Sequence, residues 1–117
     1  MKENLVMDKA IDFACRIINL HKYLKDKNEH VLSNQIVRSG TSIGANLSEA
    51  QHASSKKDFL AKTNIALKEC NETKYWLLLL KKTEYISEKE YDSINYDCIE
   101  LVKILESIVK NIKNTIN

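Results

Sequence analysis

Four long stretches of this chain repeat apolar side chains at alternating spacings of three and four residues, and no proline interrupts any of them. That spacing returns an apolar side chain to the same face on each turn of an α-helix. We therefore expect four amphipathic helices, over residues 4–27, 30–53, 55–83 and 88–115. No segment of any length shows the strict alternation of apolar and polar residues that indicates a β-strand.

The segments between the expected helices are short and polar. Two of the helices open with a capping box, in which a serine and an acidic residue three positions later satisfy free backbone amides. The pairs are Ser55 with Asp58 and Ser87 with Glu90. Because short loops join helices that run in opposite directions, the chain predicts an all-α, antiparallel up-down-up-down four-helix bundle. Its 117 residues fit a single domain, residues 1–117.

The charge balance, the apolar runs and the cysteines of the chain limit the classes of protein to which it can belong. The chain has 18 basic and 16 acidic residues, so its charge alone does not demand a nucleic-acid or anionic-membrane partner. The longest apolar run, residues 75–80, is far shorter than a membrane span, and the N-terminus lacks the apolar core of a signal peptide. Cys15, Cys70 and Cys98 are widely spaced and are expected to be reduced thiols. We therefore expect a cytoplasmic protein with no membrane partner.

The only two glycines, Gly40 and Gly44, lie four residues apart within the second expected helix. A glycine inside a helix costs about 1 kcal/mol relative to alanine, which suggests that something packs closely here. We expect a continuous helix, because the apolar stripe keeps its phase across both glycines. The alternative is a break, with Gly40 ending one helix and Ser42 capping the next. In a hairpin with the first helix, Gly40 falls opposite Ile17 and Gly44 opposite Phe13.

A polar stripe runs along the second expected helix at steps of four, four and three residues. It comprises Arg38, Ser42, Asn46 and Glu49. If the second and third helices turn near residue 54, Arg38 lies beside Cys70 between Glu69 and Glu72. An arginine–carboxylate contact there would hold the two helices in register, and we prefer this role to ligand binding. The rest of the stripe is either a specific interface or solvated surface.

Residues 75–80 are six consecutive large apolar side chains, which point in every direction around a helix. Either this helix end is buried on all sides, or one face meets another subunit. We favour the second interpretation, with Tyr75, Trp76 and Leu79 at the interface between subunits.

Evidence for enzyme chemistry is sparse. Arg16 and His21 match the Arg-x4-His motif of all-helical HEPN nucleases, in which arginine and histidine from two subunits act on RNA. The motif is short, and here it lies on the first helix rather than near the C-terminus. No histidine or cysteine spacing indicates a metal site, and no glycine-rich loop indicates a bound nucleotide, so we expect no metal and no cofactor.

Two pairs of lysines mark the two ends of the third expected helix. They are Lys56 with Lys57 and Lys81 with Lys82. Such lysines are usually solvated surface. In a ring of subunits, however, lysines that face the axis are multiplied by symmetry and could form a basic channel that contacts RNA or DNA without reading its sequence.

Residues 35–50 (QIVRSGTSIGANLSEA), with residues 58–62, 65–69 and 72–80, resemble a family of small bacterial four-helix-bundle proteins. The family was first noted inside intervening sequences of large-subunit ribosomal RNA genes. The resemblance implies a homopentamer, and kinship with accessory proteins of diversity-generating retroelements, which are basic rings that bind nucleic acid and a reverse transcriptase. The family's motif residues map to Arg38, Ser42, Asn46, Glu49, Glu69, Glu72 and Thr73, and the resemblance implies no catalytic role for them.

These observations favour a non-enzymatic oligomeric bundle that acts as an interaction or scaffold protein. Its expected partners are further copies of itself, RNA or DNA, and an unidentified protein. The alternative is a HEPN-like ribonuclease that uses Arg16 and His21.

Overall fold

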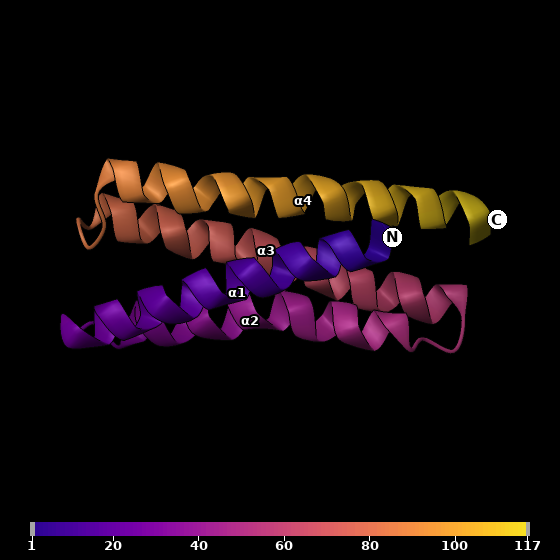
Figure 1. Ribbon diagram of the computed structural model, residues 1–117, viewed down its shortest axis with the longest axis horizontal. Coiled ribbons are helices and arrows are strands. Elements are labelled where there is room, and N and C mark those ends of the chain that lie inside the picture. The colour runs from indigo at the N-terminus through magenta and orange to yellow at the C-terminus, as the bar shows by residue number, and fades with distance from the viewer. Residues whose placement is uncertain (1, 117) are drawn as a thin grey trace.

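The computed structural model describes the backbone of residues 2–116 and the side chains of residues 5–116. It contains four α-helices, α1 (Lys2–Asp26), α2 (Val31–Gln51), α3 (Lys56–Lys82) and α4 (Glu88–Ile116). Short turns join them into an elongated antiparallel bundle of 48 × 22 × 21 Å (Figure 1). The predicted all-α four-helix bundle is confirmed. Within the described residues, no helix is long and apolar enough to cross a membrane.

Both predicted capping boxes are present where α3 and α4 begin. The amide of Asp58 donates to Ser55 Oγ at 3.0 Å, while the Asp58 carboxylate accepts from the amide of Ser54 at 3.2 Å. At the start of α4 the exchange is reciprocal: Glu90 N donates to Ser87 Oγ at 3.1 Å, and Ser87 N donates to Glu90 Oε1 at 2.7 Å. The Ser87 hydrogen bonds lower the pKa of Glu90, because they favour its charged form.

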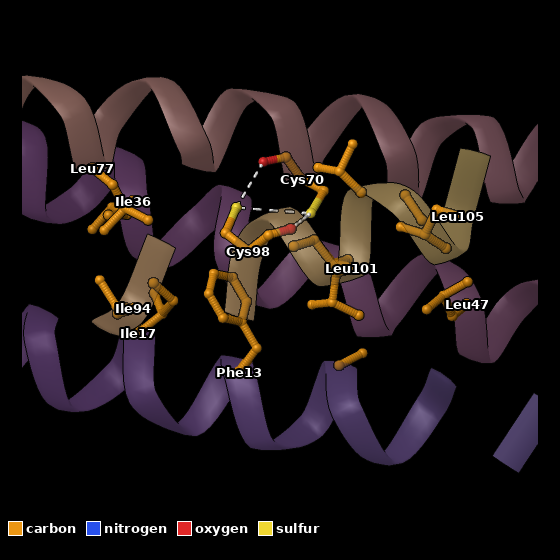
Figure 2. Packing of buried hydrophobic residues seen from close by; sticks show 14 of the residues in the cluster. Phe13, Ile17, Ile36, Leu47, Cys70, Leu77, Ile94, Cys98, Leu101 and Leu105 are labelled. Carbon is orange, nitrogen blue, oxygen red and sulfur yellow. Dashed lines mark hydrogen bonds between the residues drawn. The ribbon is translucent and has the colours of Figure 1, made fainter. Parts of the chain in front are cut away.

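The core lies along the axis of the bundle and draws side chains from all four helices (Figure 2). Its largest fully buried apolar side chains are Phe13, Ile17, Leu24, Ile36, Ile43, Leu77, Leu80, Leu101 and Leu105. Successive helices pack against one another, and α1 meets α4 to close the bundle. Two ion pairs cross that closing seam, Lys9 with Glu100 at 3.2 Å and Arg16 with Asp97 at 2.7 Å.

Helix α2 continues without a break through both glycines. A Cβ atom placed on Gly40 would lie 2.7 Å from Ile17 Cγ2, so Gly40 faces Ile17 as the sequence predicts. The predicted pairing of Gly44 with Phe13 is wrong. A Cβ atom on Gly44 would meet Ala10 at 3.7 Å and Met7 at 3.9 Å, which precede Phe13 on α1. The Phe13 ring instead points into the core (Figure 2).

Candidate functional site

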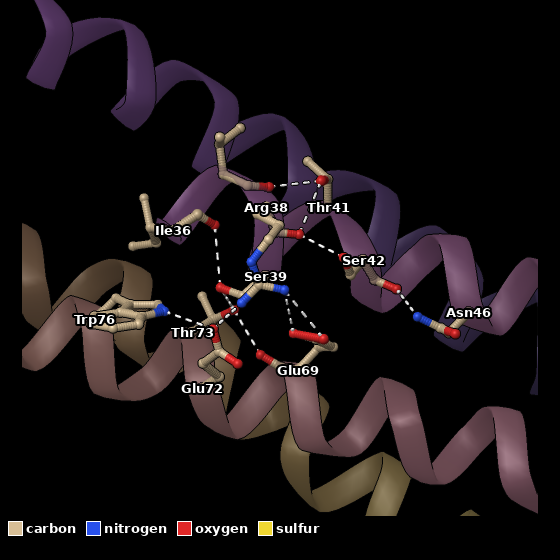
Figure 3. A network of polar contacts seen from close by, with 11 residues as sticks. Ile36, Arg38, Ser39, Thr41, Ser42, Asn46, Glu69, Glu72, Thr73 and Trp76 are labelled. Carbon is tan, nitrogen blue, oxygen red and sulfur yellow. Dashed lines mark hydrogen bonds and ion pairs between the residues drawn. The ribbon is translucent and has the colours of Figure 1, made fainter. Parts of the chain in front are cut away.

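Arg38 projects from the middle of α2 across to α3, where two carboxylates receive it (Figure 3). Its Nη1 lies 3.3 Å from Glu69 Oε1 and 3.4 Å from Oε2, and its Nη2 contacts Glu72 Oε2. Partial burial opposes the charge of Arg38, but the hydrogen bonds and negative charges of Glu72 and Glu69 outweigh it and raise the guanidinium pKa. The turn between α2 and α3 therefore brings Arg38 next to Glu69 and Glu72, as the sequence predicts.

The Glu72 carboxylate links this cluster to the aromatic residues of α3. Its Oε2 also accepts a hydrogen bond from Trp76 Nε1 at 3.1 Å (Figure 3). Tyr75 packs edge-on against the Trp76 ring, with the ring centres 5.2 Å apart. The link between the arginine cluster and the aromatic pair was not predicted, although the four-residue spacing of Glu72 and Trp76 is a signal for their contact.

A buried hydroxyl pair lies beneath the charged cluster. Thr73 Oγ1 and Ser39 Oγ are 2.8 Å apart, and both side chains are fully buried between α2 and α3 (Figure 3). Each hydroxyl also reaches a backbone carbonyl of its own helix, so neither is left unpaired. Ser39 is part of this contact and was not among the residues predicted for the site. Its position directly after Arg38 in the chain was the available signal.

Two further residues of the polar stripe, Ser42 and Asn46, do not bridge α2 and α3. Ser42 Oγ donates to the Arg38 carbonyl at 2.6 Å, and Asn46 Nδ2 donates to the Ser42 carbonyl at 2.8 Å, both within α2. Short polar side chains bond readily to the carbonyl one turn earlier, which explains the difference. Glu49 does cross to α3, where its carboxylate pairs with Lys62 at 3.0 Å. That hydrogen bond raises the pKa of Lys62.

A single subunit covers more of the apolar run at residues 75–80 than the sequence suggests. Leu77 and Leu80 are fully buried, and Trp76 and Leu79 are half-buried. Tyr75 remains 53% exposed. Large apolar side chains are also exposed at Val31, where α2 begins, and at Ile65 on α3. The bundle therefore buries most of the run, and large apolar side chains remain exposed on all four helices, including Leu5, Ile11 and Ile18 on α1 and Tyr96 on α4.

We name the surface formed by Arg38, Glu69, Glu72, Tyr75, Trp76 and Leu79 the α2–α3 face. It combines two exposed or half-buried aromatic rings with an arginine whose side chain is 49% exposed. Residues of these types dominate the binding energy of protein–protein interfaces.

Replacing Glu72 with glutamine tests the charged part of this face. Glu72→Gln keeps an oxygen acceptor for the Trp76 indole but removes the negative charge beside Arg38. Because the Arg38 side chain is half exposed, we expect a loss of only about 0.5–1 kcal/mol in the free energy of unfolding at low salt. The loss should shrink in 1 M NaCl, which urea titrations at two salt concentrations would measure. Glu49→Gln is the matched control, because Glu49 is more exposed than Glu72. A larger loss of unfolding free energy for Glu49→Gln than for Glu72→Gln would contradict this prediction.

Arg16 and His21 contact different helices. Arg16 binds α4, with Nη1 2.7 Å from Asp97 Oδ2 and Nη2 3.0 Å from Ser93 Oγ. His21 faces α2, where its Nδ1 lies 2.6 Å from Ser33 Oγ. Each side chain therefore ties α1 to a neighbouring helix, and one subunit does not bring the two together as a catalytic pair.

The four candidate lysines occupy opposite ends of α3, whose 27 residues span about 40 Å. Lys56, Lys57 and Lys82 are exposed. Lys81 is half-buried, with its Nζ 4.5 Å from the centre of the Tyr91 ring. The two pairs are too far apart to form one local basic patch. Among the residues with described side chains, no group of histidine, cysteine or acidic residues could hold a metal ion.

Comparison with known proteins agrees with the fold. A family model described as 23S rRNA-intervening sequence protein matches residues 2–107. The crystal structure of a protein of unknown function from the S23 ribosomal protein family of Bacteroides thetaiotaomicron is similar, at 58% sequence identity and a TM-score of 0.91. That match covers 94% of this chain and 99% of the other. No curated protein gives a significant match. The chain belongs to the 23S rRNA-intervening sequence protein family.

Proposed function

We propose that this protein is a non-enzymatic scaffold whose copies assemble into a homo-oligomer through the α2–α3 face. The observation that carries the proposal is the shared Glu72 carboxylate, which holds Arg38 and Trp76 together beside the exposed Tyr75 ring. Aromatic rings supply apolar area to a contact, and the anchored charges restrict how a second subunit can dock.

A ring is the form of assembly that this proposal favours, and the family resemblance implies five subunits. In a ring each subunit presents two different surfaces, one to each neighbour. The α2–α3 face is one of them. The non-enzymatic part of the proposal rests on Arg16 and His21, whose side chains are each engaged in contacts between helices.

A charge placed on the α2–α3 face tests where the subunits meet. Tyr75→Glu should dissociate the oligomer, because burying an unpaired carboxylate in an apolar contact is costly. The monomer should keep its helical content, since Tyr75 is 53% exposed within one subunit. Size-exclusion chromatography with light scattering would measure the mass. Tyr96→Glu, at a 70% exposed tyrosine on α4, is the matched control. Equal masses for both variants would place the interface elsewhere.

We further propose that the assembled ring binds RNA or DNA without sequence preference, through lysines repeated by symmetry. The exposure of Lys56 and Lys57 supports this role. The logarithm of the binding constant should fall linearly with the logarithm of salt concentration, by about 0.9 for each duplex phosphate neutralised. The double change Lys56→Gln with Lys57→Gln should reduce the slope. Lys81→Gln should change it little, because Lys81 packs over Tyr91. A flat salt dependence would contradict the nucleic-acid proposal.

A further inference from the structure

Two cysteines that lie 28 positions apart in the sequence meet at the centre of the core. Cys70 on α3 and Cys98 on α4 are both fully buried, and their Sγ atoms are 3.9 Å apart (Figure 2). Neither thiol is bonded to the other. Neither residue has a place in the proposed assembly.

The geometry around the pair is reciprocal. Cys70 Sγ lies 3.5 Å from the Cys98 carbonyl oxygen, and Cys98 Sγ lies 3.4 Å from the Cys70 carbonyl oxygen (Figure 2). Each thiol therefore reaches the backbone of the opposite helix, which shows that α3 and α4 approach closely at this level. Side-chain rotation with a small shift of either helix would bring the sulfur atoms to the bonding distance of about 2.05 Å.

We propose that Cys70 and Cys98 are a latent disulfide, which a peroxide-class oxidant closes to cross-link α3 to α4. In the first step, one thiolate attacks a peroxide oxygen, giving a sulfenic acid and water once protons are exchanged. In the second, the other thiol attacks the sulfenic sulfur, the S–S bond forms, and a second water leaves. Together the two thiols lose two electrons and two protons, and the peroxide gains them to form two waters.

Access to the pair controls how fast this reaction runs. The contact with Cys98 and burial raise the pKa of the Cys70 thiol, so little of the nucleophilic thiolate exists while the bundle is closed. The reaction therefore waits for α3 and α4 to part, and mild urea should accelerate it. The disulfide therefore forms only in molecules whose α3 and α4 have separated. Cys15 is exposed on α1 and would react first, so it must be removed from the experiment.

Folded Cys15→Ser protein treated with hydrogen peroxide tests the proposal. Intact mass should fall by two hydrogen atoms, and peptide mapping should find residues 70 and 98 linked. Because the bond closes a loop across the α3–α4 turn, the oxidised protein should melt higher, by on the order of 10 °C. Dithiothreitol should reverse both changes. Cys15→Ser with Cys98→Ala is the control, in which a disulfide can form only between molecules.

Three results would overturn the inference. The first is an unchanged mass after prolonged exposure to peroxide in mild urea, at a urea concentration where circular dichroism still shows the folded bundle. The second is oxygen addition to one sulfur, or linkage between molecules, in place of the internal bond. The third is an internal disulfide that lowers the melting temperature, which would show that the helices cannot accommodate it. None of these results depends on the oligomeric state, so the proposed scaffold function is tested separately.

Discussion

Gly40→Ala is expected to destabilise the bundle by about 2 kcal/mol, although alanine is the better helix former. The added methyl group would lie 2.7 Å from Ile17 Cγ2, 2.9 Å from Cγ1 and 3.1 Å from Cβ. Ile17 is fully buried and branched at Cβ, so it cannot rotate away without displacing its neighbours. Helices α1 and α2 would have to separate slightly along their contact. Urea unfolding followed by circular dichroism would measure the loss.

Gly44→Ala is the matched control, one helical turn along the same face of α2. Its new methyl group would meet Ala10 at 3.7 Å, an ordinary van der Waals distance. We expect the free energy of unfolding of this variant to rise by about 0.5–1 kcal/mol, because alanine loses less backbone entropy on folding than glycine does in a helix. Equal effects at the two glycines would contradict the packing described for α1 and α2.

Trp76→Ala is expected to weaken each contact between subunits by about 2 kcal/mol or more, because a tryptophan at the centre of an interface contributes a large share of its binding energy. The variant also loses the indole hydrogen bond that helps to fix the Glu72 carboxylate beside Arg38. Sedimentation equilibrium over a dilution series would measure the association, and circular dichroism would show whether the helices persist.

Trp76→Phe separates the two roles of the indole. It keeps an aromatic ring on the α2–α3 face but removes the donor to Glu72, so we expect a weakening smaller than that of the alanine variant. A folded Trp76→Ala protein with unchanged association would exclude Trp76 from the interface.

Apolar periodicity was sufficient to predict the helices, because each helix buries one stripe in one core and no residue breaks the pattern. It predicted the pairing of Gly40 with Ile17, but not the neighbours of Gly44. Counting residues from the turn places Gly44 opposite Phe13, whereas Ala10 and Met7 lie next to it and the Phe13 ring points into the core. Cys70 and Cys98 lie at nearly equal distances along the chain from the turn between α3 and α4, so the same counting would have paired them.

The part of the candidate site around Arg38 was predicted correctly, because a long charged side chain pairs with the opposite charges on the neighbouring helix. Arg38 reaches between helices, and Glu69 and Glu72 lie opposite it. The sequence was a poor guide for Ser42 and Asn46, because short polar side chains can bond either to a partner helix or to their own backbone. Residue spacing along the chain does not decide between these two kinds of partner.

Sedimentation velocity of the unmodified protein at micromolar concentration tests the central claim most directly. If the α2–α3 face joins subunits in a ring, the protein should sediment as one closed species with a mass near five times the 13.5 kDa of a single chain. A folded species of 13.5 kDa that persists as the concentration rises would contradict the proposed assembly.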